Sequence, residues 1–249
     1  MKLLRFRKGA VAAQVEKYDS ATAYQKLLKR NLKQYKGNPE LAFAWSIGSV
    51  SLELFREQGD AHVSVLRHYG LADGMAVYDL GCGCGRTAQA LQRSGWRGRY
   101  TGVDIIAPFI NELKAKCPGY DAYVHYKPTL RADDGSVDLV FHWSVFTHLS
   151  PEECFLYLKD TFRTLKPGGK TIFSFLEVTE PLHQRVFSNR VQGLEQGSPA
   201  PILDTYLHRD WIRKWAGELG FTEPVFTDGD DATHHPPFWQ SLAAMQKPA

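Results

Sequence analysis

The sequence has few cysteines, and they follow no metal-site pattern. The four cysteines of the 249-residue chain are Cys82, Cys84, Cys117 and Cys154, and none combines with another cysteine or a histidine at zinc-ligand spacing. We therefore expect no metal site and predict buried thiols in a reduced, cytoplasmic protein. No apolar run is long enough to cross a bilayer, and the N-terminus lacks the apolar stretch of a secretory signal peptide.

The sequence also lacks an excess of one charge. Its formal net charge is +3, from 30 basic and 27 acidic residues, which gives no strong signal for nucleic-acid binding. The basic residues are concentrated at the start, where residues 1–36 contain ten of them and only two acidic residues. A hydrophobic content of 43% and a charged content of 23% are typical of globular proteins and exclude disordered and fibrous classes.

We divide the chain into residues 1–70, a basic helical arm with lead-in helices, and residues 71–249, one domain. In the arm, Tyr24, Leu27, Leu28 and Tyr35 fall near one helical face. The arm is interpreted as a substrate lid, an anionic-surface contact, a homodimer contact or a solvated helix. Residues 39–57 and 60–69 are predicted as two helices separated by Gly59, with His62 and His68 at surface or capping positions.

From residue 71 onward, strands alternate with helices. Strands are predicted over 75–80, 99–104, 122–126, 137–142 and 170–175, and helices over 87–93, 108–116, 150–165 and 209–219. This alternation favours a doubly wound, mostly parallel sheet with helices on both faces. Two final strands, 221–227 and 238–246, have no helix between them and predict an antiparallel hairpin. Residues 177–204 are expected to be irregular.

A glycine-rich loop follows the first strand, in the order Asp79-Leu80-Gly81-Cys82-Gly83-Cys84-Gly85-Arg86. Glycines at alternate positions allow a tight turn and close approach of a ligand to the backbone. A nicotinamide dinucleotide site would need a third glycine where Arg86 stands. Asp79 suits a ligand with a cationic end, and Asp104, which ends the second strand, suits a ribose.

These residues resemble the motifs of class I S-adenosylmethionine-dependent methyltransferases. The resemblance extends over Val103-Asp104, residues 135–140 and residues 165–169. It implies a seven-stranded Rossmann-like fold and S-adenosylmethionine as cofactor. It also implies that the cofactor is bound by the glycine loop, the end of the second strand and neighbouring residues, namely Asp79, Gly81, Cys82, Gly83, Gly85, Asp104, Ile105, Tyr126, His142 and Trp143. The adenine contact is left open between Tyr126 and Asp133.

The same resemblance places the acceptor near the end of the fourth strand. The residues Trp143-Ser144-Val145-Phe146 do not match the motif of enzymes that methylate amino groups of nucleic acid bases, so a small-molecule acceptor is expected, with transfer to oxygen. If the acceptor is a hydroxyl, His148 or His142 is the predicted general base, with His183, His208 and Tyr206 as alternatives. Two other hypotheses are a protein or RNA acceptor docked by the arm, and a non-catalytic binding protein of the same fold.

Overall fold

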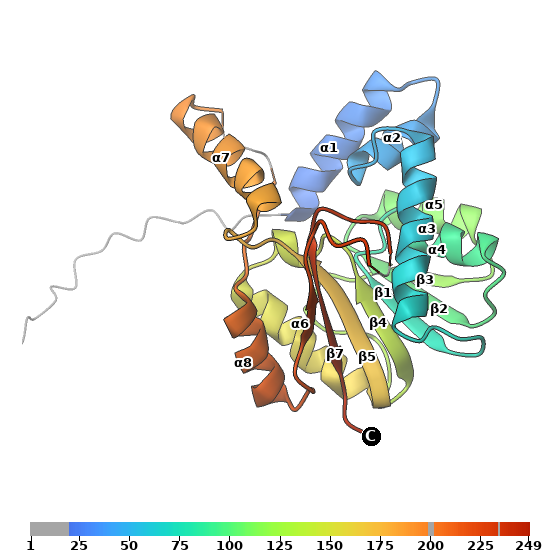
Figure 1. Cartoon of the computed structure of the whole chain (residues 1–249). Helices are drawn as coiled ribbons and strands as arrows, with labels where there is room; N and C mark the ends of the chain where they lie inside the picture. Colours follow the sequence, from blue (N-terminus) through green and yellow to red (C-terminus); the bar gives the residue numbers. More distant parts are fainter. Residues whose placement is uncertain (1–19, 199–201, 234) are drawn as a thin grey trace, which may run out of the picture.

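A computed structural model describes residues 20–198, 202–233 and 235–249. Seven strands form one sheet in the order β3-β2-β1-β4-β5-β7-β6 (Figure 1). The strands are β1 (Ala76–Leu80), β2 (Arg99–Asp104), β3 (Asp121–Val124), β4 (Val137–His142), β5 (Leu165–Phe175), β6 (Val225–Thr227) and β7 (Ser241–Gln246). The pairs among β1 to β5 are parallel, and β7 is antiparallel to both β5 and β6. The predicted fold class is confirmed.

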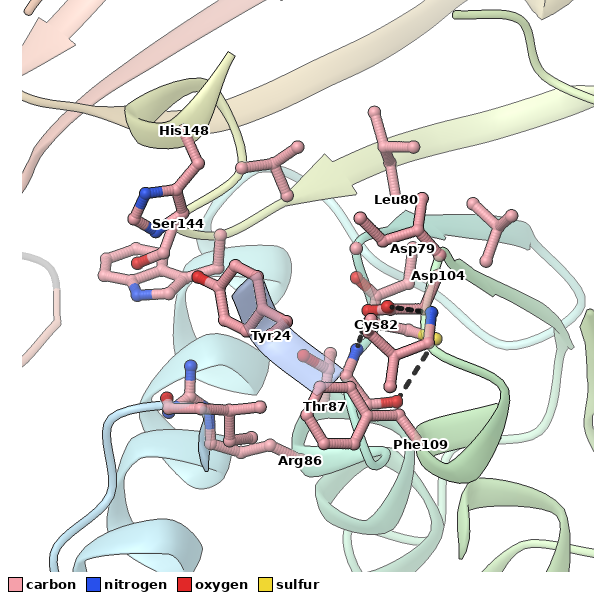
Figure 2. A pocket seen from close by; sticks show the side chains of 18 of the residues that line it. Tyr24, Asp79, Leu80, Cys82, Arg86, Thr87, Asp104, Phe109, Ser144 and His148 are labelled. Atoms are coloured by element: carbon pink, nitrogen blue, oxygen red, sulfur yellow. Dashed lines mark hydrogen bonds between the residues drawn. The ribbon is translucent and has the colours of Figure 1, made fainter. Parts of the chain in front are cut away.

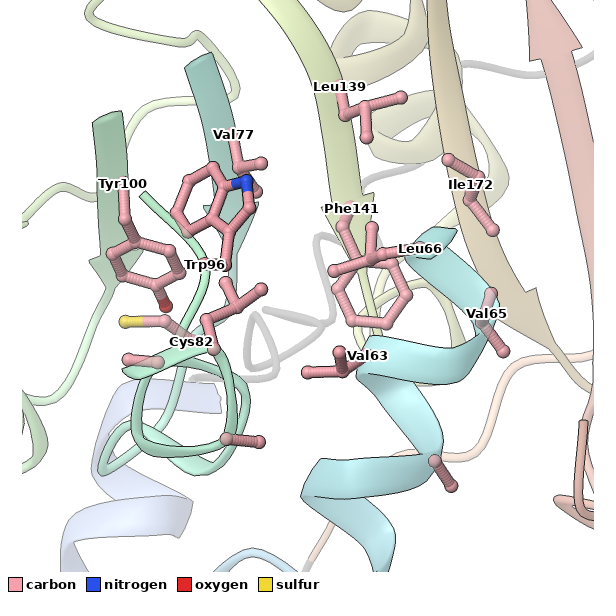
Figure 3. Close-up of a cluster of buried hydrophobic side chains, with 14 of the residues drawn as sticks. Val63, Val65, Leu66, Val77, Cys82, Trp96, Tyr100, Leu139, Phe141 and Ile172 are labelled. Carbon is pink, nitrogen blue, oxygen red and sulfur yellow. The ribbon is translucent and has the colours of Figure 1, made fainter. Parts of the chain in front are cut away.

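Helices cover both faces of the sheet. They are α1 (Ser20–Gln34), α2 (Pro39–Ser46), α3 (Leu52–His68), α4 (Arg86–Arg93), α5 (Ala107–Lys116), α6 (Pro151–Thr164), α7 (Pro181–Glu195) and α8 (Arg209–Leu219). Residues of α3, α4 and α5 share one hydrophobic cluster with the sheet, and residues of α6 and α8 share a second. Figure 3 shows α3 placing Val63 and Leu66 toward Phe141 of β4.

The order of the strands determines where a ligand can bind. The chain runs outward from β1 through β2 to β3, and then returns to β4 on the other side of β1. Helices on either side of this reversal leave a crevice at the carboxyl ends of β1 and β4, which is the usual binding position in open α/β sheets.

The break between the lead-in helices was predicted in the wrong place. The helix α3 continues through Gly59, and the chain breaks at residues 47–51 instead, where Ser51 accepts a hydrogen bond from Leu54 N and caps α3. Gly59 has a packing reason: a Cβ there would lie 2.8 Å from the carbonyl oxygen of Arg86. The glycine therefore lets α3 approach α4 closely rather than ending a helix.

The expectation of an irregular segment at 177–204 is also wrong in its main part, because it contains α7. Within this helix only His183 is buried, while Phe187, Val191 and Leu194 are exposed. Figure 1 shows α7 projecting from the body near α1. With so few buried positions, α7 has no core-facing stripe from which its helical period could be recognised.

Several strand boundaries also differ from the sequence prediction. The strand β5 begins at Leu165, five residues before the predicted start, with a register irregularity opposite Val137 and Leu139. The final strands are shorter than expected. Residues 1–19 of the predicted arm lie outside the described residues. The arm's described part contains α1, which holds α2 through the Asn31 Nδ2 to Ser46 Oγ hydrogen bond of 3.0 Å. No helix among the described residues has the length and apolarity to span a membrane.

Candidate active site

A cavity lies at the carboxyl ends of β1, β2 and β4 (Figure 2). Its wall includes the glycine loop from Asp79 to Gly83, the turn from Asp104 to Ile106 after β2, and the residues from Trp143 to Val145 after β4. Ser20 and Tyr24 of α1 and His148 complete the opposite side. The fold therefore brings together most of the predicted site residues, from segments up to 69 positions apart in the sequence.

The glycine loop is fixed by its backbone. The N–H groups of Gly81 and Cys82 donate to the carbonyl of Val103 at 2.7 and 3.0 Å. Gly81 and Gly83 have φ values of +70° and +54°, which favour glycine. A Cβ on Gly81 would overlap the Val145 side chain, and one on Gly83 would lie 3.2 Å from Ile47 Cγ2. Glycine at both positions keeps the backbone itself as part of the cavity wall.

Gly85 differs from the other two glycines and corrects a prediction. It lies outside the cavity wall, at the N-cap of α4 with φ of +92°. A Cβ there would lie 2.9 Å from Leu113 Cγ of α5. Gly85 is thus required for packing α4 against α5, and its predicted cofactor contact is not found.

Asp104 connects the loop to the turn after β2. Its Oδ2 accepts a hydrogen bond from Gly83 N and its Oδ1 accepts one from Ile106 N, both at 2.9 Å. Burial raises the pKa of Asp104 to about 6, although these backbone donors act in the opposite direction. A carboxylate has about four acceptor positions, so beyond its backbone donors, which include Ile105, Asp104 can still accept a hydrogen bond from a ligand hydroxyl.

Asp79 forms the other acidic point of the cavity. Its side chain is buried and accepts hydrogen bonds from Tyr100 Oη, at 2.6 Å, and from Thr87. Burial raises the pKa of Asp79 to about 7. A cationic ligand beside it would stabilise the ionised form, so the site can bind a positive charge near neutral pH.

Arg86 stands where a dinucleotide-binding loop would have its third glycine, and its side chain is buried. Its Nη1 donates to Gln58 Oε1 at 2.8 Å and to Ser49 Oγ at 3.1 Å. Burial lowers the pKa of Arg86 to about 10. The guanidinium fills space beside the loop and is held by polar groups of the segment before α3 and of α3 itself.

The sequence analysis missed His62, which was expected at a surface or cap. It is buried in the cavity wall, with Nδ1 2.9 Å from Thr87 Oγ1 and its ring centroid 4.9 Å from that of Trp143. Burial, followed by the charge of Arg86, lowers its pKa well below the usual value. Gly59, His62 and Leu66 follow one another at i, i+3 and i+7. This helical spacing is the signal in the sequence that could have placed His62 on the buried face.

His142 does not occupy the predicted position. It is fully buried on the other face of β4, stacked on Phe173 with ring centroids 5.1 Å apart, and lies outside the cavity wall. Neither ring nitrogen has a hydrogen-bond partner, and burial lowers the pKa of His142 to about 3. Side chains alternate between the faces of a strand, so Phe141 and His142 point to opposite sides. His142 is therefore excluded as general base and cofactor contact.

His148 does lie in the cavity wall, in a short 3₁₀ helix (η1, Phe146–His148). Its Nδ1 is 2.7 Å from the carbonyl oxygen of Leu203. Because a carbonyl can only accept, Nδ1 must carry the proton, and the neutral ring then has its lone pair on Nε2. The Tyr24 ring meets the His148 ring edge-on at 5.8 Å, and burial lowers the pKa of His148.

Ser144 is a second residue that the sequence analysis did not single out. Its φ of +55° is unusual for a residue other than glycine. Its N–H donates to Ser174 Oγ and its Oγ accepts from Gln240 Nε2, both at 2.7 Å. This network holds the chain where it leaves β4 and keeps Trp143 in the cavity wall, against Phe238.

The predicted adenine contacts are not found. The Tyr126 side chain is 65% exposed and lies outside the wall, as does Asp133, whereas Ile105 and His125 are part of it. Among the alternative bases, His183 bonds to the Trp239 carbonyl, His208 caps α8 and Tyr206 packs on Phe187. None of these three lines the cavity.

The geometry can be compared with known proteins. Residues 77–169 match a family model described as a methyltransferase domain. An arsenite methyltransferase of Aquipseudomonas alcaligenes is 32% identical over 178 residues, which are 64% of this chain and 49% of that protein. A trans-aconitate 2-methyltransferase of Rhodopseudomonas palustris is 29% identical over 109 residues, 42% of this chain and 40% of that protein. The chain spans about half the length of the curated relatives it matches.

A solved structure shares the fold. The magnesium protoporphyrin IX methyltransferase of Synechocystis, with bound S-adenosylhomocysteine, superimposes with a TM-score of 0.60 and 19% identity, covering 89% of this chain and 99% of that one. Over residues 77–169 this chain thus resembles the domain of class I S-adenosylmethionine-dependent methyltransferases.

Proposed function

We propose that the protein is an S-adenosylmethionine-dependent methyltransferase that transfers the methyl group to an oxygen atom of a small molecule. The cavity fits the cofactor in three respects. The glycine loop leaves backbone exposed where a Cβ would intrude, Asp79 suits an ammonium group, and the Asp104 carboxylate has acceptor capacity for ribose hydroxyls.

The observation that carries the choice of an oxygen acceptor is the state of His148. Its Nδ1–H is engaged by the Leu203 carbonyl, so Nε2 is available as a base on a ring that lines the cavity. A hydroxyl is a better nucleophile when a base accepts its proton. Bound S-adenosylmethionine supplies a methyl group on a positively charged sulfur, which makes that carbon electrophilic.

The remaining task of the protein is to orient the acceptor and exclude water. Tyr24, Trp143, Val145 and Leu149 make this side of the wall largely apolar, which favours a small molecule with an apolar body. His148 would accept the hydroxyl proton at Nε2. The relatives named as a trans-aconitate 2-methyltransferase and a ubiquinone biosynthesis O-methyltransferase support a small-molecule acceptor.

The test is transfer of label from methyl-tritiated S-adenosylmethionine to four acceptor classes: phenols, primary amines, RNA and protein. We expect label on a phenolic or alcoholic oxygen. The His148→Gln variant should lose about 100- to 10,000-fold in turnover, whereas the control His68→Gln, an exposed histidine at the end of α3, should match the wild type.

The other outcomes identify the competing functions. Transfer to RNA or protein, with none to the small molecules, would replace the small-molecule proposal. Transfer to amines that does not depend on His148 would contradict the oxygen acceptor. Cofactor binding without transfer to any acceptor would instead support a non-catalytic binding protein.

A further inference from the structure

The His148 ring is held by a segment far away in the sequence. Residues 202–206, which we name the strap, follow α7 and lie along η1. The Thr205 N–H donates to the Thr147 carbonyl at 2.7 Å, and Leu203 supplies the carbonyl that accepts from His148 Nδ1. Tyr206 then forms a bridge with Leu176 at the end of β5. The strap is thus attached both to η1, which carries His148, and to Leu176, the residue after β5.

The strap also carries a buried carboxylate. The Asp204 side chain is 8% exposed, and its Oδ1 lies 3.9 Å from His148 Nδ1. Its Oδ2 accepts a hydrogen bond from Nε of Arg190, near the end of α7. A buried carboxylate is retained only where it is paired, so Arg190 connects the position of the strap to the otherwise loosely packed α7.

We propose that Asp204 and Arg190 are positioning residues for methyl transfer. Together they hold the strap so that His148 stays in the tautomer with its proton on Nδ1 and its lone pair on Nε2. This inference rests on the proposed role of His148 as general base. It assigns α7 a function, since its Arg190 anchors the strap that orients the ring.

The two charges act on the His148 pKa in opposite directions. Asp204 raises it and Arg190 lowers it, while burial lowers it and the hydrogen bond to Leu203 raises it. Tyr24 of α1 is the titratable side chain whose ring contacts His148 from the opposite side. Removing the carboxylate should therefore lower the His148 pKa, and removing the guanidinium should raise it.

The experiment is an NMR titration of ¹⁵N-histidine-labelled full-length protein without added ligand. It reports the tautomer and pKa of His148 directly, with the signal assigned by its loss in His148→Gln. The test variants are Asp204→Asn and Arg190→Gln. Asp60→Asn and Arg93→Gln are matched controls, because these residues form an ion pair of 2.6 Å between α3 and α4 outside the cavity wall.

We expect the wild type to show a single Nδ1–H tautomer. Asp204→Asn should lower the pKa and add the second tautomer, Arg190→Gln should raise the pKa, and Asp204→Glu should restore wild-type behaviour. The controls should leave both readouts unchanged. Circular dichroism shows which variants are folded, and if Asp204→Asn is unfolded, the sign of the Arg190→Gln shift still decides.

Equal shifts of one sign in both variants, or an unchanged tautomer, would overturn the positioning role. The failure of the proposed function gives a different result. If the tautomer and the opposite shifts are observed but His148→Gln keeps full turnover, the strap still orients the ring and the general base is another group.

Discussion

The two sides of the cavity are built in different ways. The side that we assign to the cofactor, here called the cofactor side, lies between Asp79 and Asp104 and is built mainly from backbone N–H groups and two carboxylates. The side that we assign to the acceptor, here called the acceptor side, is built from side chains of α1, of η1 and, through the strap, of the segment after α7. A local motif thus determines the first side, whereas tertiary packing determines the second. The first should tolerate few changes to its backbone, and the second should tolerate changes that spare His148 and the residues that position it.

The largest expected effect is on turnover and comes from the acceptor side. In His148→Ala the base is lost, so turnover should fall about 100- to 10,000-fold. Cofactor affinity should stay close to that of the wild type, because Asp79 and Asp104 are unchanged. Kinetics combined with calorimetry tests this. A parallel loss of cofactor affinity would mean that the two sides are not separate.

The next largest effect concerns the backbone of the cofactor side. Gly83→Val forces an unfavourable φ and inserts a side chain at the cavity wall beside Ile47, so cofactor affinity should fall about 100-fold or more. The matched control is Gly95→Val, whose φ is +74° but whose Cβ would meet nothing within 4 Å. Equal losses of affinity in both variants would attribute the effect to backbone strain and not to the cavity.

Asp104→Ala tests the ribose contact with a smaller change. It removes the acceptor of the proposed ribose hydrogen bonds and should weaken cofactor binding by about 1.5–3 kcal/mol, roughly 10- to 150-fold. It also removes the partner of the Gly83 and Ile106 N–H groups, so thermal unfolding must be measured alongside. A folded Asp104→Ala protein with unchanged affinity would contradict the ribose role.

The smallest effect is a dependence of cofactor binding on pH. Burial raises the pKa of Asp79 to about 7, so without a ligand this carboxyl gains a proton as the pH falls through 7. A bound ammonium group requires the ionised form, and binding below this pH must release the proton. Affinity should therefore weaken by up to about tenfold per pH unit below 7. Asp79→Asn should abolish this dependence above the pKa of Asp104, which is about 6, and calorimetry from pH 7.5 to 6.5 measures it.

The difference between the two sides also explains what the sequence could predict. Asp79, Gly81, Gly83 and Asp104 follow strand ends that hydrophobic patterning identifies, and the parallel sheet brings these ends together. Their spacing, together with the resemblance to methyltransferase motifs, therefore placed them in one predicted site. The error at Gly85 arose because glycine also serves helix packing, here against Leu113.

The acceptor side was less predictable, because its parts are distant in sequence. The choice between His142 and His148 depended on which face of β4 the former occupies, and the core around Phe173 decides that. The contact of Leu203 with His148 spans 55 positions, and no local pattern specifies it. His62 was missed because it was judged by its spacing to other possible metal ligands. Its place in the cavity wall depends instead on the packing of α3 against the sheet.

The central claim is that the cavity between Asp79 and Asp104 binds S-adenosylmethionine, and calorimetric titration of the full chain tests it most directly. We expect micromolar binding of S-adenosylmethionine and S-adenosylhomocysteine, about −8 kcal/mol, and no binding of NAD, because Arg86 replaces the third glycine of a dinucleotide loop. Tight binding of NAD together with no binding of either adenosyl compound would contradict it.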